Sequence, residues 1–431
     1  MSIPQELIDV IIDFSHDDNQ TLRACALTSR AFVASSQLHL FSRIKLILSD
    51  SPDREAIPWK LPGHTFQRFH SMISVSPHIP LLVTTLEVYF DTTYYRRAIV
   101  DTTSFVAVFK SLISLKRYVV SAGFDSIDLR FCEDKSLTRA IFNEVLSVGL
   151  VELCLDGLDA IPEADIFSTS EKWPSLRSLS ILWSGFQQQD FAWDLASLES
   201  LKVGGVHSFA YLENWLSNNN SCSELRWKNF VAVIAGLDDL LVVKTALRIP
   251  APYLEEVVID HSFPAESIDP SLDLRPLANL RSVRLICGEF DNDVPCPLMS
   301  PSVQEITIEI CPESRAVVTL FEGGKLSRID GSIGAQNLPR LSFVTIAIHP
   351  SSPTHCSAAS CDCMNPDEDP SDPVNLITLA RDMPLLSSKG ILNIVGKSSA
   401  CCCFLLFRFH SGKHRAYNVG WYTALESGPS D

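Results

Sequence analysis

Apolar residues recur along most of this chain in one short template, apolar-x-x-apolar-x-apolar. The last two positions have the spacing of a strand with one buried face, because alternate residues of a strand point to the same side. Where adjacent copies can be read, their starts lie 22 to 38 residues apart. The copies are Val83/Leu86/Val88, Leu115/Tyr118/Val120, Leu150/Leu153/Leu155, Leu176/Leu179/Ile181, Leu198/Leu201/Val203, Leu254/Val257/Ile259, Leu280/Val283/Leu285, Val303/Ile306/Ile308 and Leu341/Val344/Ile346.

The gap between the copies that start at 198 and 254 predicts a further, degenerate copy near Leu225 and Trp227. A unit of one helix and one strand cannot bury its apolar face alone, so successive units are expected to stack. The pattern predicts an α/β solenoid over residues 66–350, with a curved parallel sheet inside and helices outside. An ordinary doubly wound α/β domain is the alternative, and the number of copies argues against it. Helical periodicity between the strands is clearest at Phe105/Phe109/Leu112, Leu137/Ile141/Val145 and Leu240/Lys244/Leu247.

The N-terminal residues have a different pattern, which predicts a module of three short amphipathic helices over residues 1–45. Pro4 suits a first helical position. The run from His16 to Asn19 suits the start of a second helix, and Ser29 suits the start of a third. Three helices of this length bury little surface, so part of their apolar surface is expected to be available to a partner. The apolar stripe of the first helix consists of Leu7, Ile8, Ile11 and Ile12.

Three further segments complete the predicted organisation. Residues 46–65 are expected to be a linker between the helices and the solenoid. Residues 351–375 are rich in Ser, Pro and Asp, which predicts a flexible acidic loop. Residues 376–431 are expected to cap the solenoid with a helix at 376–383 and strands at 390–395 and 404–409.

Composition excludes several functional classes. With 46% apolar residues the chain can bury a large core, and its net charge of -16 argues against nucleic acid and anionic membranes as partners. Neither a leader sequence nor a run of about 18 apolar residues can be read, so a cytoplasmic or nuclear protein is expected. The 13 cysteines are an odd number in a large chain, which favours reduced thiols.

The sequence contains no nucleotide-binding, hydrolase or zinc-protease motif, so neither catalytic residues nor a cofactor are expected. His355, Cys356, Cys361 and Cys363 form a group of soft ligands, but the paired C-x-x-C spacing of structural zinc sites is absent. We therefore expect no metal there.

The segments IPQELIDVIIDF, DDNQTLRACALTSRAF and LHLFSRIKL together resemble the F-box of fungal, basidiomycete-like F-box proteins. The resemblance covers about a tenth of the chain, and Phe32 stands where many members have Trp. That family commonly places leucine-rich-like repeats after the F-box, which agrees with the periodic strands, although the Asn of regular repeats is missing here. The resemblance implies an irregular leucine-rich-repeat-like solenoid and a non-catalytic substrate adaptor of a Skp-cullin-F-box ubiquitin ligase.

In such a protein the helical module would dock into an apolar groove of a Skp-type adaptor on the cullin core. About half of the apolar residues are expected to hold the module itself together. The residues implied for docking are Pro4, Leu7, Ile8, Ile11, Ile12, Leu22, Cys25, Leu27 and Phe32.

The strand residues between the inward positions would face outward and bind an unknown protein target. Their mixed charges suit a protein or peptide, and because acidic residues outnumber basic ones, a basic patch on the target is expected. The candidate target-binding residues are Glu152, Asp156, Ser180, Lys202, Glu256, Asp260, Arg284, Glu305, Thr307 and Glu309.

Two other functions stay open from the sequence. One is a repeat scaffold without a ligase role, in which the N-terminal helices only cap the solenoid. The other is an α/β enzyme with a dispersed active site, which would have one deep pocket lined by titratable groups.

Overall fold

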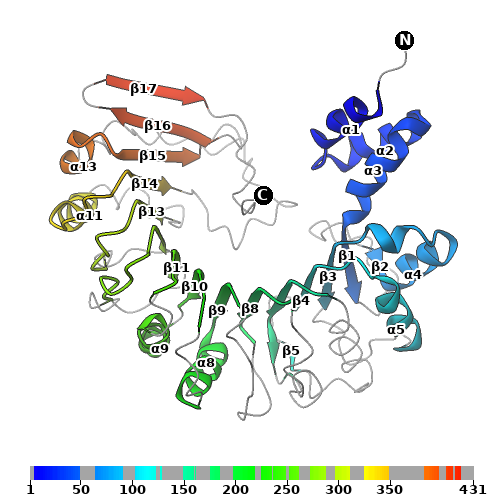
Figure 1. Ribbon diagram of the computed structural model, residues 1–431, viewed down its shortest axis with the longest axis horizontal. Coiled ribbons are helices and arrows are strands. Elements are labelled where there is room, and N and C mark those ends of the chain that lie inside the picture. Colours follow the sequence, from blue (N-terminus) through cyan, green and yellow to red (C-terminus); the bar gives the residue numbers. More distant parts are fainter. Residues whose placement is uncertain are drawn as a thin grey trace, which may run out of the picture. The chain divides into compact units, whose positions relative to one another are not determined.

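The protein is an α/β molecule built from parallel strands and intervening helices, as its computed structural model shows (Figure 1). It divides into two compact units, Met1–Leu198 and Glu199–Asp431, which we describe separately. The structure describes residues 4–48, 64–90, 102–122, 127–128, 149–159, 161, 175–184, 198–218, 225–234, 236–248, 252–261, 272–287, 297–310, 325–348, 383–397, 404–410 and 413–418.

Three helices open unit 1, as the sequence predicts: α1 (Gln5–Asp13), α2 (Asn19–Thr28) and α3 (Arg30–Ser42). Pro4 is the residue before the first helical turn rather than within it. The Asp18 carboxylate caps α2 by accepting hydrogen bonds from two backbone N–H groups, and the Ser29 hydroxyl caps α3 in the same way. These side chains satisfy N–H groups that a helix start leaves unpaired.

The rest of unit 1 is a parallel sheet with the strand order β2-β1-β3-β4-β6-β8. Two further short strands, β5 (Ile127–Asp128) and β7 (Leu158–Asp159), pair with each other. The sheet strands are β1 (Arg43–Leu48), β2 (His64–Thr65), β3 (Thr85–Phe90), β4 (Arg117–Ala122), β6 (Glu152–Asp156) and β8 (Ser178–Leu182). The connecting helices are α4 (Phe66–Val75), the 3-10 helix η2 (Ile79–Leu82) and α5 (Thr102–Ser111).

Unit 2 continues the same construction, with strands β9 to β15 parallel and paired in chain order. Strands β16 and β17 then add antiparallel pairs. The strands are β9 (Ser200–Gly204), β10 (Asn229–Val233), β11 (Glu256–His261), β12 (Ser282–Cys287), β13 (Glu305–Ile310), β14 (Phe343–Ile348), β15 (Leu392–Lys397), β16 (Phe404–His410) and β17 (Lys413–Asn418). The helices are α8 (Val206–Asn218), α9 (Leu237–Arg248), α11 (Lys325–Gly334) and α13 (Pro384–Ser388), of which α8 and α9 lie side by side (Figure 1).

The apolar template explains the core of both units. All of its predicted positions are buried except Leu341, which is half-buried. The degenerate copy is real, because Trp227 precedes β10 and is buried together with Phe230 and Ala232. Neighbouring copies pair in register, so equivalent apolar residues stack from strand to strand and close one face of each sheet.

A repeated pair of hydrogen bonds fixes where each strand begins. Lys116 N and Arg117 N both donate to Thr84 O, at 2.8 and 3.0 Å. In unit 2, Gln304 N and Glu305 N donate to Arg281 O at the same distances. Each turn is therefore tied to the turn of the preceding copy, which holds successive strands in register.

The structure corrects the predicted linker at 46–65. Residues 46–48 belong to β1, which pairs with β3 along its whole length, and residues 64–65 form β2. The reason is visible in the alternation Arg43-Ile44-Lys45-Leu46, because Ile44 and Leu46 are buried. This strand is a full member of the sheet.

The remaining predictions divide by region. The helices predicted around Phe105 and Leu240 are confirmed as α5 and α9, and the strands near 390 and 404 as β15 and β16. The helix predicted at 376–383 lies outside the described residues except for Met383, and α13 begins at the next residue, Pro384. The helix predicted at 137–145 and the loop at 351–375 lie outside the described residues.

Candidate functional site

The helical module has a small core of its own. Ile8 and Ile12 of α1 and Leu22 of α2 are buried against one another. Cys25, Ala31, Phe32 and Leu40 pack around them and stay partly exposed. The division expected within the apolar residues is therefore present, because only part of them is needed to join the three helices.

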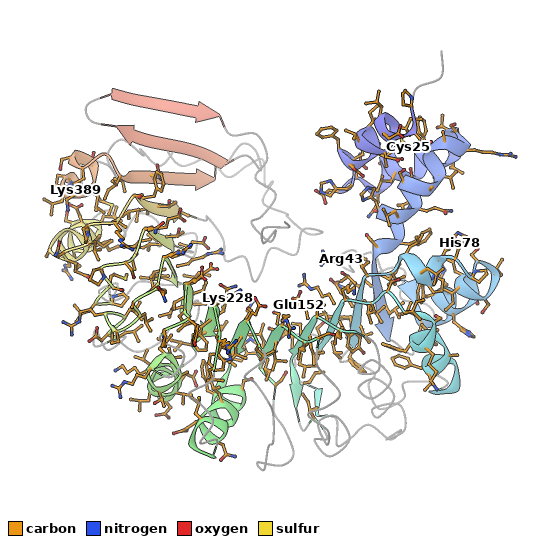
Figure 2. The ribbon with its side chains drawn as sticks, viewed as in Figure 1. Cys25, Arg43, His78, Glu152, Lys228 and Lys389 are labelled. Atoms are coloured by element: carbon orange, nitrogen blue, oxygen red, sulfur yellow. The ribbon has the colours of Figure 1, made fainter. Side chains whose placement is uncertain are left out.

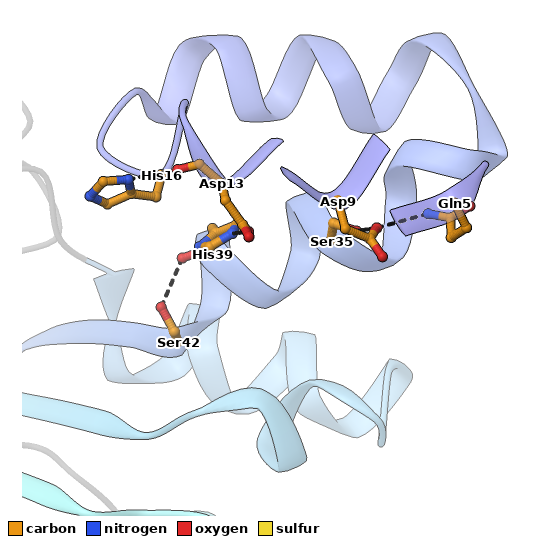
Figure 3. Close-up of polar contacts among 7 residues, drawn as sticks. All are labelled: Gln5, Asp9, Asp13, His16, Ser35, His39 and Ser42. Atoms are coloured by element: carbon orange, nitrogen blue, oxygen red, sulfur yellow. Dashed lines mark hydrogen bonds and ion pairs between the residues drawn. The ribbon is translucent and has the colours of Figure 1, made fainter. Parts of the chain in front are cut away.

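Polar contacts fix how α1 lies on α3 (Figure 3). The Ser35 hydroxyl donates to the Asp9 carboxylate, which also accepts from Gln5 Nε2 at 2.8 Å. One turn further, Asp13 Oδ1 and His39 Nε2 lie 2.7 Å apart. The hydrogen bonds from Ser35 and then Gln5 lower the pKa of Asp9 below its ordinary value. These contacts hold one side of α1 toward α3.

The opposite side of α1 is apolar and exposed. Leu7 and Ile11 are 55% and 57% exposed, and Val10 and Phe14 continue the same stripe at three- and four-residue spacing. Leu27, near the end of α2, is 89% exposed. The name apolar surface is used below for the exposed apolar residues of the module, which are Leu7, Val10, Ile11 and Phe14 on the α1 stripe and, separately, Leu27 on α2. Single exposed leucines are ordinary, but a stripe of four apolar residues on one helix is a feature of interaction sites.

The predicted docking residues therefore separate into two groups. Leu7, Ile11 and Leu27 are available to a partner, and Pro4 is exposed beside them at the start of α1. Ile8, Ile12 and Leu22 are buried in the module's core and are not available for docking, whereas the docking role of the partly exposed Cys25 and Phe32 stays a prediction. An Asp at the Ile8 position would place a charge in this core and disrupt the fold rather than test docking. The residues that serve the core wholly or in part are Ile8, Ile12, Leu22, Cys25 and Phe32.

Sequence reasoning missed Val10 and Phe14. The stripe was placed on Leu7, Ile8, Ile11 and Ile12, which spans two neighbouring sides of the helix. The spacing Leu7-Val10-Ile11-Phe14 is equally helical and would have identified the exposed side.

The outward face of the unit 2 sheet carries a set of carboxylates around one arginine. On β11, β12 and β13, in-register pairing places Glu256 two strands from Glu305, and Asp260 two strands from Glu309. Arg284 lies on the strand between them, and its guanidinium contacts Glu309 at 2.9 Å. Thr307 pairs directly with Arg284. Lys202 lies on β9, which is separated from β11 by β10. These predicted target-binding residues do share one face, and four carboxylates outnumber one arginine on the three central strands.

In unit 1 the predicted target-binding residues are Glu152, Asp156 and Ser180. Glu152 and Asp156 are half-buried on the outward face, and Glu152 Oε1 lies 3.2 Å from Arg117 Nε. Ser180 is only 8% exposed, and its hydroxyl has no hydrogen-bond partner. The prediction that Ser180 is available to a target is therefore wrong. Alternation in the strand gave its face correctly but could not show that this position is covered.

The prediction missed a second group of outward residues on β1, β3 and β4; residues 43–45 of β1 had been assigned to the helical module and residues 46–48 to the linker. The group comprises Arg43 and Lys45 on β1, Glu87 and Tyr89 on β3, and Arg117 on β4. Arg43 and Glu152, both labelled in Figure 2, lie on the side of this sheet away from α4 and α5. The alternation Arg43-Ile44-Lys45-Leu46 was the signal that could have revealed Arg43 and Lys45, whereas Glu87, Tyr89 and Arg117 lie on strands that the apolar template had predicted.

No group of three or more His, Cys, Asp or Glu residues in the described part of the chain is arranged to hold a metal ion. The cluster around His355 and Cys361 lies outside that part. Cys25 is a free thiol. None of the described helices has both the length and the apolar character needed to cross a membrane.

Comparison with known proteins yields no relative. The chain matches no protein-family model, and no curated protein matches it. Inferences about function therefore depend on the surfaces described above and on the pattern of residues in the sequence.

Proposed function

We propose that this chain is the substrate-recognition adaptor of a Skp-cullin-F-box ubiquitin ligase, acting in the cytoplasm or nucleus. In this proposal α1 to α3 form an F-box that docks onto a Skp-type adaptor. The observation that carries it is the apolar surface: Leu7, Ile11 and Leu27 are more than half exposed while the module's core is complete without them. The resemblance of residues 3–46 to a fungal F-box supports the same partner.

The strand-rich remainder would then hold the protein to be ubiquitinated. Parallel strands that pair in chain order over β9 to β15, and over β1, β3, β4, β6 and β8, support an irregular leucine-rich-repeat-like solenoid. A broad sheet face with charged residues suits a protein or peptide partner. The carboxylates on β11 and β13 support a basic patch on that partner. The proposal assigns no chemistry and no cofactor to this chain.

A second candidate function is a repeat scaffold whose N-terminal helices cap the sheet. One observation favours it: α3 ends at Ser42 and β1 begins at the next residue, so no linker separates the module from the sheet. Thr84 N also donates to Ser42 O at 2.9 Å, and α3 contacts η2. A cap of this kind gives the exposed side of α1 no partner, which is where the two proposals differ.

The experiment that separates them is affinity purification of the full-length chain from its source cells. The substitution Ile11→Asp places a charge on the apolar surface, and Leu241→Asp is the matched control, because Leu241 is 61% exposed on α9. We expect Ile11→Asp to lose the ligase core and keep the target, while Leu241→Asp keeps both. Recovery of the ligase core with Ile11→Asp, or its absence with the wild type, would favour the scaffold. Deleting residues 1–45 is a poorer test, because it removes half of β1.

A further inference from the structure

The outward face of β1, β3 and β4 has more cations than carboxylates. Its outward positions hold Arg43, Lys45 and Arg117, with Glu87 as their carboxylate. Arg43 and Arg117 lie in the same register row two strands apart, which is about 10 Å at the usual strand spacing. This local excess of positive charge occurs in a chain whose net charge is -16.

Two of these cations already have partners. The Arg43 guanidinium contacts Glu87 Oε1 through Nε at 2.7 Å and through a terminal nitrogen at 2.5 Å. Arg117 Nε lies 3.2 Å from Glu152 Oε1, in a geometry that makes no hydrogen bond. Each carboxylate is therefore held by an arginine.

Lys45 is the cation that remains. Its ammonium lies 5.2 Å from the centroid of the Tyr89 ring, and no carboxylate of a described residue lies within 4.0 Å of it. The residue is half-buried, and loss of solvent is the main cause of its lowered pKa, opposed by the charge of Glu87 and assisted by that of Arg43. A partly desolvated ammonium with no carboxylate of the described residues in contact favours an anion brought by another molecule.

We propose that Lys45, together with Arg43 and the ring of Tyr89, binds a carboxylate side chain from an acidic segment of a protein partner. Lys45 supplies a charge that no carboxylate of the described residues contacts, and Arg43, which is exposed, supplies further donors. The outward face of these strands suits an extended peptide, whose successive side chains reach the sheet at regular intervals. This inference rests on the target-binding half of the proposed function and names the chemistry that unit 1 recognises.

The test is binding of a fluorescein-labelled octaglutamate peptide to the purified full-length chain, followed by fluorescence anisotropy. The variant is Lys45→Gln and the matched control is Lys110→Gln, which removes an exposed lysine of α5 in the same unit. We expect Lys45→Gln to weaken binding of the peptide about tenfold, because it removes one charge-assisted contact, and Lys110→Gln to leave binding unchanged. Lys45→Arg should retain binding, and added salt should weaken it.

Three results would overturn the inference: no binding by the wild type, equal affinity for wild type and Lys45→Gln, or equal loss with Lys110→Gln. Binding of a phosphoserine peptide in place of octaglutamate would also overturn the choice of a carboxylate. Circular dichroism of each variant checks that the fold is kept. The assay contains no Skp-type adaptor, so a chain that binds the adaptor but not the peptide contradicts this inference alone.

Discussion

The helical module and the strand-rich units use their apolar residues in opposite ways. In the sheets, the apolar positions of each strand are covered by the neighbouring copies and by helices, so nearly all of them are buried. In the module, three side chains form the core, and α1 leaves a complete apolar stripe exposed. In a sheet of stacked copies, each copy covers the apolar residues of the next. Three short helices enclose too little volume to bury every apolar residue they carry.

This difference makes the exposed stripe informative. Apolar side chains in contact with water cost stability relative to buried ones, at about 25 cal/mol per Å² of apolar surface. The module has four exposed apolar side chains along α1, although polar side chains at these positions would leave its core unchanged. A partner that covers the stripe is the simplest physical reason for such a surface.

The largest expected effect is the loss of stability when a buried leucine is truncated, and it should differ in extent between the core of the module and the core of the unit 1 sheet. Leu22→Ala removes one of the three buried side chains of the module, and Leu86→Ala removes one of many in the unit 1 sheet. Each should cost about 2 to 5 kcal/mol, but Leu22→Ala should unfold α1 to α3 locally while the strands stay intact. Hydrogen exchange measures this directly. Loss of protection throughout the unit 1 strands in Leu22→Ala would show that the module has no separate core.

A smaller effect is expected at the helix caps. Asp330 is 2% exposed, and its carboxylate accepts from Leu385 N and Leu386 N at 2.8 Å each, at the start of α13. Asp330→Ala leaves these N–H groups unpaired and should cost about 1 to 3 kcal/mol. Asp18, which caps α2, is exposed, so water can replace it. Denaturant unfolding of both variants checks the order, and a larger cost for Asp18→Ala would contradict it.

The smallest effect is a response to acid. The pKa of Asp9 is lowered by Ser35 and Gln5, and that of Asp18 by the hydroxyl and backbone N–H of Thr21. A lowered pKa in the folded state stabilises the module above about pH 4 and loses this contribution as the pH falls through the folded-state pKa. Helix content followed against pH should fall less steeply in Asp9→Asn than in the wild type. An unchanged profile would show that the Asp9 contacts do not stabilise the module.

Sequence periodicity predicted the strands well because their burial follows a strict rule. Each inward residue stacks on its equivalent in the next copy, so the same spacing returns along the chain, even in the degenerate copy at Trp227. The β1 strand was missed because its two buried residues, Ile44 and Leu46, follow the last helix without a turn signal. A linker was expected between helices and sheet, and the chain has none at that point.

The site was less predictable, because exposure depends on neighbours that the local pattern does not contain. The stripe on α1 was found, but the choice between Ile8 and Val10 as its outward member depends on how α1 lies on α3. That arrangement is fixed by the Asp9 and Asp13 contacts across 26 residues. The burial of Ser180 could likewise not be predicted from the alternation of residues in its strand.

Isothermal titration of the purified full-length chain with a purified Skp-type adaptor tests the central claim most directly. The account predicts saturable binding by the wild type, at least about tenfold weaker binding by Ile11→Asp or Leu7→Asp, and unchanged binding by Leu241→Asp. The account is contradicted if the wild type does not bind, or if Ile11→Asp binds as tightly as Leu241→Asp.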